Sequence, residues 1–192
     1  MNVLHRQNGD IILYESFLVK KDADEMFIHF FHHLQWQQEQ LRMFGKYILS
    51  PRLVAWYGDQ GAIYKYSGVE HTPLTWEPSL LHLKDKVARY ARRPFNSVLA
   101  NLYRNQNDSM GWHSDAEPEL GSAPFIASLS LGETRLFKMQ HKKTKEMLDI
   151  NLTGGSLLIM GEGVQKCWRH CIPKTRKIKN PRINLTFRYI EK

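Results

Sequence analysis

The spacing of hydrophobic and polar residues changes about halfway along the chain. Apolar residues recur at helical spacing after Pro78, and Asp22 or Asp24 can cap an earlier helix that runs to about Trp36. From about residue 95, short apolar runs alternate with glycine-containing breaks, which is typical of β-strands. The pattern predicts strands at 11–14, 97–103, 125–131, 135–140, 147–152, 156–160, 165–171 and 182–190.

This order of elements predicts a protein that is mainly β with buttressing helices. Seven or eight short strands after two helices favour a double-stranded β-helix, or jelly roll, supported by helices on one face. A chain of 192 residues is long enough for one domain with a sizeable core. We therefore expect a single domain over 1–192, with a helical support over about 1–95 and the jelly-roll core over about 96–192.

The last predicted strand has two chemically different faces. Successive side chains of a strand alternate sides, so Arg182, Asn184, Thr186 and Arg188 share one face, opposite an apolar one. A solvated edge strand would explain this pattern. Two guanidinium groups roughly 20 Å apart along the strand also suit a pocket that holds anionic oxygens.

Two histidines and an aspartate suggest a metal site. His113 and Asp115 lie on the same side of an extended segment, and His170 follows after a long gap. Two histidines with one carboxylate are the ligand set of non-haem Fe(II) oxygenases, whereas a structural zinc site has four protein ligands. A single histidine such as His170 is more often a hydrogen-bonded core residue, so the evidence lies in the combination.

These motifs together resemble the AlkB family of Fe(II)/2-oxoglutarate-dependent nucleic-acid dealkylases. The resemblance runs from about residue 10 to the end, and the segment from Pro51 to Gly68 is similar to the branch that repairs alkylated bases. It is carried by His113-Ser114-Asp115, His170, Arg182-x-Asn184-x-Thr186-x-Arg188, Asn101-Leu102-Tyr103, Asp108-Ser109-Met110-Gly111-Trp112 and Gly155-Ser156-Leu157-Leu158.

The resemblance implies a jelly-roll core with an N-terminal α/β extension that recognises the nucleotide. It also implies that Fe(II) is bound by His113, Asp115 and His170, with 2-oxoglutarate and O2 as co-substrates. Arg182 would bind the distal carboxylate of 2-oxoglutarate, and Arg188 would lie near its metal-bound end. Other residues implied in co-substrate binding are Asn101, Tyr103 and Asn184.

The resemblance implies a pocket for a flipped-out base as well, because a base within a duplex cannot reach buried iron. The residues implied are Tyr64, Tyr66, Ser67 and Glu117, although ordinary strand packing would also explain the two tyrosines. Phe44 aligns with a hydrophobic finger that enters the base stack. A buried hydrophobic turn is the alternative for Phe44.

Composition fits this interpretation. The formal net charge of +8 favours a polyanionic partner. A basic loop between His170 and Arg182 is expected to contact phosphates, and it contains Lys174, Arg176, Lys177 and Lys179. Cys167 and Cys171 are expected to be reduced thiols, because a zinc site there would lack a fourth ligand.

The sequence thus predicts DNA repair by oxidative dealkylation of N-alkylated bases of the 1-methyladenine and 3-methylcytosine type. The alternatives are the same chemistry on RNA, protein hydroxylation, and a basic nucleic-acid-binding module without catalysis. No apolar run approaches the length of a membrane span. We expect a monomeric, soluble, intracellular protein, in the cytoplasm if bacterial and in the nucleus if eukaryotic.

Overall fold

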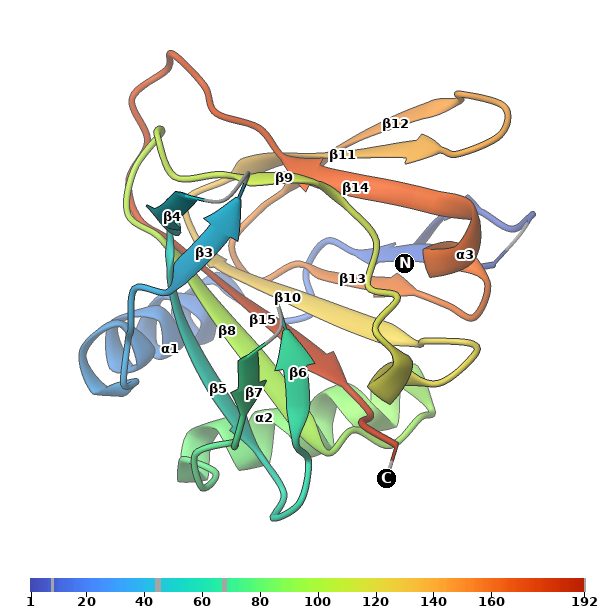
Figure 1. The fold of residues 1–192 in the computed structure, drawn as a ribbon. Coiled ribbons are helices and arrows are strands. Elements are labelled where there is room, and N and C mark those ends of the chain that lie inside the picture. The colour runs from blue at the N-terminus through green and yellow to red at the C-terminus, as the bar shows by residue number, and fades with distance from the viewer. Residues whose placement is uncertain (8, 44–45, 67–68, 192) are drawn as a thin grey trace.

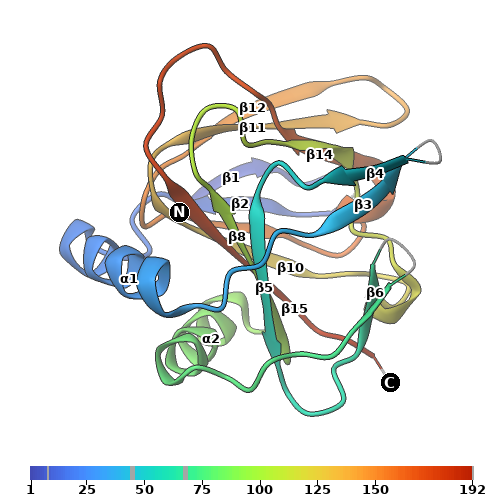
Figure 2. The ribbon, with the colours of Figure 1, turned by 60° about the vertical axis from the view of Figure 1, so that its left-hand side comes forward.

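The computed structural model, which describes residues 1–7, 9–43, 46–66 and 69–191, contains two larger antiparallel sheets with the two long helices on one side (Figures 1 and 2). The larger sheet has the spatial order β1 (Asn2–His5), β2 (Ile11–Tyr14), β13 (Leu157–Met160), β10 (Ile126–Gly132), β15 (Arg182–Arg188), β8 (Ser97–Tyr103) and β5 (Leu53–Gly58). The smaller sheet has the order β12 (Met147–Leu152), β11 (Arg135–His141), β14 (Trp168–Ile172) and β9 (Met110–His113).

The remaining elements lie around these two sheets. Two hairpins form separate two-stranded sheets, β3 (Gln40–Met43) with β4 (Lys46–Leu49) and β6 (Tyr64–Tyr66) with β7 (Val69–His71). The helical elements are α1 (Lys20–His33), α2 (Pro78–Ala91), the short α3 (Val164–Cys167) and a 3-10 turn (Pro118–Leu120). None of the described helices is both long and apolar enough to cross a lipid bilayer.

Two hydrophobic cores lie on opposite faces of the larger sheet. On one face, Leu185 and Phe187 of β15 are fully buried in a cluster that includes Phe30 of α1 and Leu83 of α2. On the other face, side chains of β2, β10 and β13 share a cluster with Phe137 of β11 and other residues of the smaller sheet. Because strand side chains alternate, the polar row of β15 faces the space between the two sheets.

The predicted pattern of mainly β structure with helices is confirmed, and the strand ends shift by only one or two residues in most cases. Three details were wrong. The first helix begins at Lys20 after Val19, without a side-chain cap from Asp22 or Asp24, and it ends at His33 rather than near Trp36. The segment predicted as a strand over 165–171 begins inside α3, so that β14 starts only at Trp168. The last strand ends at Arg188 rather than at residue 190.

Several short strands were not predicted at all: β1, β3, β4, β5, β7 and β9. Most have only three or four residues, too few to establish a period. Strands β1, β2 and β5 of the first half join the larger sheet. The predicted boundary near residue 95 stays a prediction.

Gly132 ends β10 directly opposite Arg182 of β15, at a backbone conformation that side chains rarely adopt. Its φ is +80°, and a Cβ there would lie 2.7 Å from the Pro181 carbonyl oxygen and 2.8 Å from the Phe27 ring. We expect Gly132→Ala to lower the free energy of unfolding by about 2–4 kcal/mol, from left-handed strain and overpacking together. Urea unfolding of the full chain measures this change.

Gly61 is the matched control for this prediction. Its φ of +90° is similar, but a Cβ there would meet nothing within 4 Å among the described residues. Gly61→Ala should therefore cost only the strain, about 1–2 kcal/mol. Equal losses for the two variants would show that the contacts with Pro181 and Phe27 do not matter.

Candidate active site

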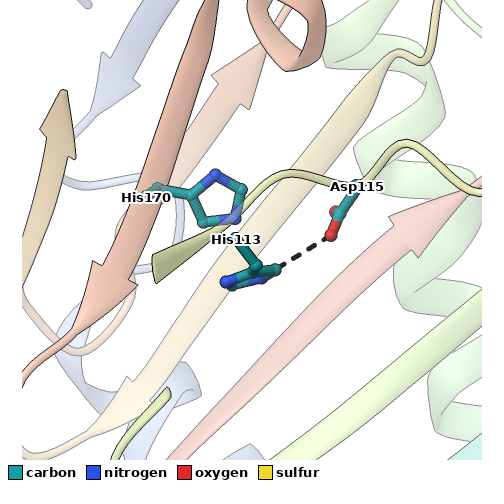
Figure 3. Close-up of side chains that lie close together, drawn as sticks. All are labelled: His113, Asp115 and His170. Carbon is teal, nitrogen blue, oxygen red and sulfur yellow. Dashed lines mark ion pairs between the residues drawn. The ribbon is translucent and has the colours of Figure 1, made fainter. Parts of the chain in front are cut away.

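The three predicted metal ligands converge between the two sheets. His113 ends β9 and lies directly opposite His170 of β14 in the antiparallel ladder, and Asp115 follows two residues after His113. Each of the three side chains offers one ligand atom, and these atoms all lie within 4.8 Å of one another (Figure 3). The arrangement predicted from sequence is therefore present as a cluster.

His113 presents its Nε2 atom to the centre of this cluster. Its Nδ1 lies 2.9 Å from the carbonyl oxygen of Gly111, which can only accept, so Nδ1 is the nitrogen that carries the hydrogen. Its Nε2 lies 3.7 Å from Asp115 Oδ1. The Gly111 carbonyl thus fixes the tautomer whose Nε2 lone pair is free for a metal.

Asp115 is buried against an arginine. Its Oδ2 accepts hydrogen bonds from Arg188 Nη2 at 2.9 Å and Arg188 Nε at 3.3 Å. Burial alone would raise the pKa of Asp115, but attraction by Arg188, His170 and His113 outweighs it and lowers the pKa to about 2. The carboxylate is therefore ionised at neutral pH, as a metal ligand must be.

His170 is buried and uncharged. Its ring stacks on Phe137 with ring centroids 5.2 Å apart, and the centroid of the His113 ring is 4.3 Å away. Burial, reinforced by repulsion from His113, lowers the pKa of His170 to about 3. Its Nδ1 is buried and, among the residues that the structure describes, has no hydrogen-bond partner. A neutral imidazole in this position suits metal ligation.

The shifted pKa of His170 predicts how stability depends on pH in the metal-free protein. Below pH 6.5, the ordinary pKa, the unfolded chain binds a proton that the folded chain accepts only near pH 3. The free energy of unfolding should therefore fall between these limits as pH decreases, by up to about 1.4 kcal/mol per pH unit. Asp115 adds to this loss only below its ordinary value of 3.8, towards pH 2.

Urea unfolding across this pH range tests the expectation, with His170→Gln as the matched variant. That variant keeps a polar side chain but cannot titrate, so its unfolding free energy should change less steeply with pH. The same slope in both proteins would contradict the assignment to His170.

Arg182 is a buried cation with unused hydrogen-bond donors. It is 1% exposed, and its Nη2 donates to Ser130 Oγ at 2.9 Å. Its Nε and Nη1 are also buried and have no hydrogen-bond partner within the described part of the chain. Burial lowers the pKa of Arg182 to about 10, so it stays protonated at neutral pH. Unsatisfied buried donors on a charged group are costly, and a carboxylate would satisfy them.

One cavity connects Arg182 with the three predicted ligands. It is also lined by Asn101, Tyr103, Glu117, Asn184 and Arg188. The face of β15 that was predicted from alternation thus does line a pocket, with Arg188 beside Asp115 and Arg182 above the Tyr103 ring, 5.3 Å from its centroid. The alternative of a solvated edge strand is wrong, because β15 pairs with β10 and β8 inside the larger sheet.

The two predicted asparagines differ in how their amides are used. The Asn184 side chain donates to Ser128 Oγ at 2.8 Å and to the Leu129 carbonyl at 3.1 Å, and it accepts from Thr186 Oγ1. These bonds occupy the amide, so Asn184 is better placed to order the pocket wall than to hold a ligand. Asn101 accepts a hydrogen bond from Arg52 Nε at 2.7 Å.

Part of the predicted base pocket lies outside the described residues. Phe44 and Ser67 lie outside the described residues, and so do the side chains of Tyr64 and Tyr66. The backbone of Tyr64–Tyr66 forms β6, as the expected strand requires. Glu117 lines the cavity, and its Oε2 is buried with no hydrogen-bond partner in the described ranges.

Several polar residues at the site were not predicted from the sequence. The serines of β10 were recognisable in principle, because Ser128 and Ser130 alternate with apolar residues and lie opposite Thr186 and Asn184. Arg52, which is 3% exposed, had no comparable signal, and neither had Gln165 of α3, which bonds the backbone of Asp115.

A second buried arginine connects the loops beside the site. Arg135 is 2% exposed and donates to the carbonyl oxygens of Asn105 at 3.1 Å, Asp108 at 2.8 Å and Pro173 at 2.9 Å. It thereby joins the loop before β9 to the basic loop after β14, which lie side by side in Figures 1 and 2.

The basic loop itself keeps most of its predicted charge exposed. Lys179 pairs with Glu133 at 3.1 Å, whereas Lys174, Arg176 and Lys177 are exposed. Both cysteines that flank His170 are free, as predicted.

Two antiparallel sheets that enclose two histidines and one carboxylate are typical of non-haem Fe(II) oxygenases. A family model described as the 2OG-Fe(II) oxygenase superfamily matches residues 10–188. The chain belongs to this superfamily and, within it, to the AlkB family. Membership implies Fe(II) as the metal, with 2-oxoglutarate and O2 as co-substrates.

Two relatives and one solved structure illustrate the similarity. Alpha-ketoglutarate-dependent dioxygenase alkB homolog 3 of Bos taurus is 40% identical over 189 residues, which cover 94% of this chain and 66% of the relative, slightly under two thirds of its length. DNA oxidative demethylase ALKBH2 of Mus musculus is 36% identical over 182 residues, covering 89% of this chain and 76% of the relative. The structure of OsALKBH1 matches with a TM-score of 0.65 at 17% identity, covering 98% of this chain and 100% of that one, and so supports the fold alone.

Proposed function

We propose that this chain repairs DNA by oxidative dealkylation of N-alkylated bases of the 1-methyladenine and 3-methylcytosine type. The family, and relatives named DNA oxidative demethylase, support this substrate class. The observation that carries the proposal is the cavity itself. It holds a two-histidine, one-carboxylate cluster and, on the polar face of β15, a buried guanidinium with two nitrogens that find no hydrogen-bond partner among the described residues.

His113, Asp115 and His170 would hold Fe(II), and Arg182 would bind the distal carboxylate of 2-oxoglutarate. Bound iron, with 2-oxoglutarate and O2, supplies hydroxylation of the N-methyl carbon, and the overall products are the repaired base, formaldehyde, succinate and CO2. Arg188 keeps Asp115 ionised and directs its Oδ2. Tyr103, Ser130 and Asn184 shape the wall on which the co-substrate would lie.

The damaged base would enter the cavity unpaired. Glu117 is well suited to contact it, because its buried Oε2 needs a donor and the exocyclic amino group of adenine or cytosine is one. We propose that Tyr64, Tyr66 and Ser67 line the remainder of this pocket and that Phe44 enters the base stack. The two hairpins would then be the N-terminal nucleotide-recognition extension beside a jelly-roll core.

The exposed cations of the basic loop would contact phosphates. These cations belong to the loop that Arg135 holds beside the site through the Pro173 carbonyl, and they are Lys174, Arg176 and Lys177. Such contacts give affinity without sequence information and should weaken as salt rises.

The test uses the full chain with Fe(II), 2-oxoglutarate and ascorbate, and a DNA oligonucleotide that carries one 3-methylcytosine. Mass spectrometry should show loss of one CH2 group per oligonucleotide, dependent on both iron and 2-oxoglutarate. Single-stranded and duplex DNA are compared in parallel with the same lesion in RNA. If only the RNA is demethylated, the substrate is RNA and the proposal of DNA as the substrate is wrong. Succinate formation without any change in either nucleic acid would contradict the proposed substrate class.

A further inference from the structure

The short segment from Gln165 to His170 contacts each of the residues His113, Ser114 and Asp115, of which the first and the last are proposed metal ligands. His113 lies opposite His170 in the strand ladder. Ser114 Oγ donates to the Trp168 carbonyl at 2.8 Å, and the backbone N–H of Asp115 donates to Gln165 Oε1 at 3.0 Å. Gln165 and Ser114 thus connect the Asp115 side of the cluster to the strand that carries the other histidine.

Gln165 is itself held firmly. It is 1% exposed, its Nε2 lies 3.5 Å from Met160 Sδ, and its backbone carbonyl accepts a hydrogen bond from Lys142 Nζ at 2.8 Å. The backbone N–H of Lys142 also donates to the Cys167 carbonyl at 2.7 Å. The turn between β11 and β12 therefore fixes α3, and α3 fixes the Gln165 side chain.

The Gln165 contact matters because Asp115 lies beyond the end of β9, where no strand ladder holds its backbone. Arg188 attracts the carboxylate through Oδ2, and Oδ1 lies 3.7 Å from His113 Nε2. A backbone free to rotate would let the carboxylate move towards Arg188 and away from the histidines. The Gln165 hydrogen bond opposes that rotation from the other side of the residue.

We propose that Gln165 and Ser114 are positioning residues that set the direction of the Asp115 carboxylate towards the metal. This inference rests on the proposed metal site and extends it to residues that touch neither metal nor substrate. Partners of metal ligands typically change metal affinity by about 10–100-fold when they are removed. We expect an effect of this size from Gln165, whose contact is to Asp115 itself, and a smaller one from Ser114.

The decisive variant is Gln165→Met, which keeps the length of the side chain but loses the carbonyl oxygen. Gln165→Glu is the conservative variant, because a carboxylate oxygen can accept the same hydrogen bond from Asp115. Lys142→Met is the matched control, since it removes a contact of α3 without touching the Asp115 segment. Ser114→Ala removes one small hydroxyl and tests the second contact.

The full-length variants are titrated anaerobically with Co(II), whose visible absorption reports both binding and the ligand arrangement. Thermal unfolding of the metal-free proteins is measured in parallel. Gln165→Met should bind Co(II) about 10–100-fold more weakly, with an altered band shape at saturation. Gln165→Glu should recover most of the affinity. Lys142→Met should unfold at a lower temperature without a loss of Co(II) affinity, because it removes a positive charge that acts on His170 and keeps the Gln165 contact to Asp115.

Two results would overturn the positioning role. One is Co(II) binding by Gln165→Met with the affinity and spectrum of the unchanged protein. The other is an equal loss of affinity in Lys142→Met, which would mean that α3 acts only through folding. If Gln165→Met fails to fold, the other two variants decide. The proposal is contradicted if Ser114→Ala binds Co(II) with the affinity of the unchanged protein while Gln165→Glu binds it much more weakly. Absence of Co(II) binding by the unchanged protein would instead overturn the proposed metal site.

Discussion

Asp115→Ala is expected to abolish metal binding and turnover while the chain remains folded. The variant removes the only carboxylate of the cluster, whose pKa of about 2 keeps it charged at any working pH. Since loss of an outer partner alone costs about 10–100-fold, loss of a ligand should reduce turnover by at least about 1000-fold. The measurement is succinate formation and DNA demethylation at saturating 2-oxoglutarate.

Asp115→Ala also removes the carboxylate that forms a buried ion pair with Arg188, so the metal-free variant should unfold more easily, by about 3 kcal/mol. The double variant Asp115→Ala, Arg188→Met separates the two effects. It should recover part of the stability but none of the metal binding. Full activity in Asp115→Ala would show that the metal site has been assigned to the wrong residues.

Arg182→Met is expected to raise the 2-oxoglutarate concentration needed for half-maximal turnover by about 100–4000-fold. Losing one member of a buried charge pair costs about 3–5 kcal/mol, and each 1.4 kcal/mol is a factor of ten. Arg182→Lys keeps the charge but loses the planar fork of the guanidinium. Its requirement for 2-oxoglutarate should therefore lie between those of the unchanged protein and Arg182→Met. Steady-state kinetics and isothermal titration with 2-oxoglutarate measure these differences.

The metal-free Arg182→Met protein should be as stable as the unchanged chain or more stable. In the absence of 2-oxoglutarate, Arg182 is a buried cation, and two of its nitrogens have no hydrogen-bond partner in the part of the chain that the structure describes, which opposes folding. A stability loss of several kcal/mol, with unchanged co-substrate binding, would make Arg182 a structural residue and contradict its role as the carboxylate ligand.

Some features of the site were predictable because local chemistry and strand geometry agree. In residues 182–188 the alternation places every polar side chain on one face, and the ladder with β10 and β8 keeps that face directed into the cavity. His113 and Asp115 are two residues apart and also reach one cluster, but Asp115 lies beyond the end of β9 and is held there by Arg188 and Gln165. Where a period of two fixes the direction of a side chain, sequence alone was sufficient.

Other features were not predictable because they depend on which segments meet in space. Gln165 reaches Asp115 across 50 residues, and Arg52 reaches Asn101 across 49. A lone glutamine or arginine carries no period, so its burial follows only from the packing of both sheets. The four-residue α3 was not predicted for a related reason, since it spans only Val164–Cys167 and is held by the β11–β12 turn rather than by its own propensity.

Because β15 lies in the interior of the larger sheet, its backbone hydrogen bonds should open far less often than those of the two hairpins. Every amide of β15 lies between β10 and β8, so its hydrogen exchange should require unfolding of most of the sheet. Among the described residues, each of the two hairpins forms a sheet of its own two strands, and the amides of these strands should exchange through small local openings. The arginine row would then keep its geometry during fluctuations that rearrange the hairpins, so a bulky ligand could be admitted without disturbing the carboxylate end of the cavity.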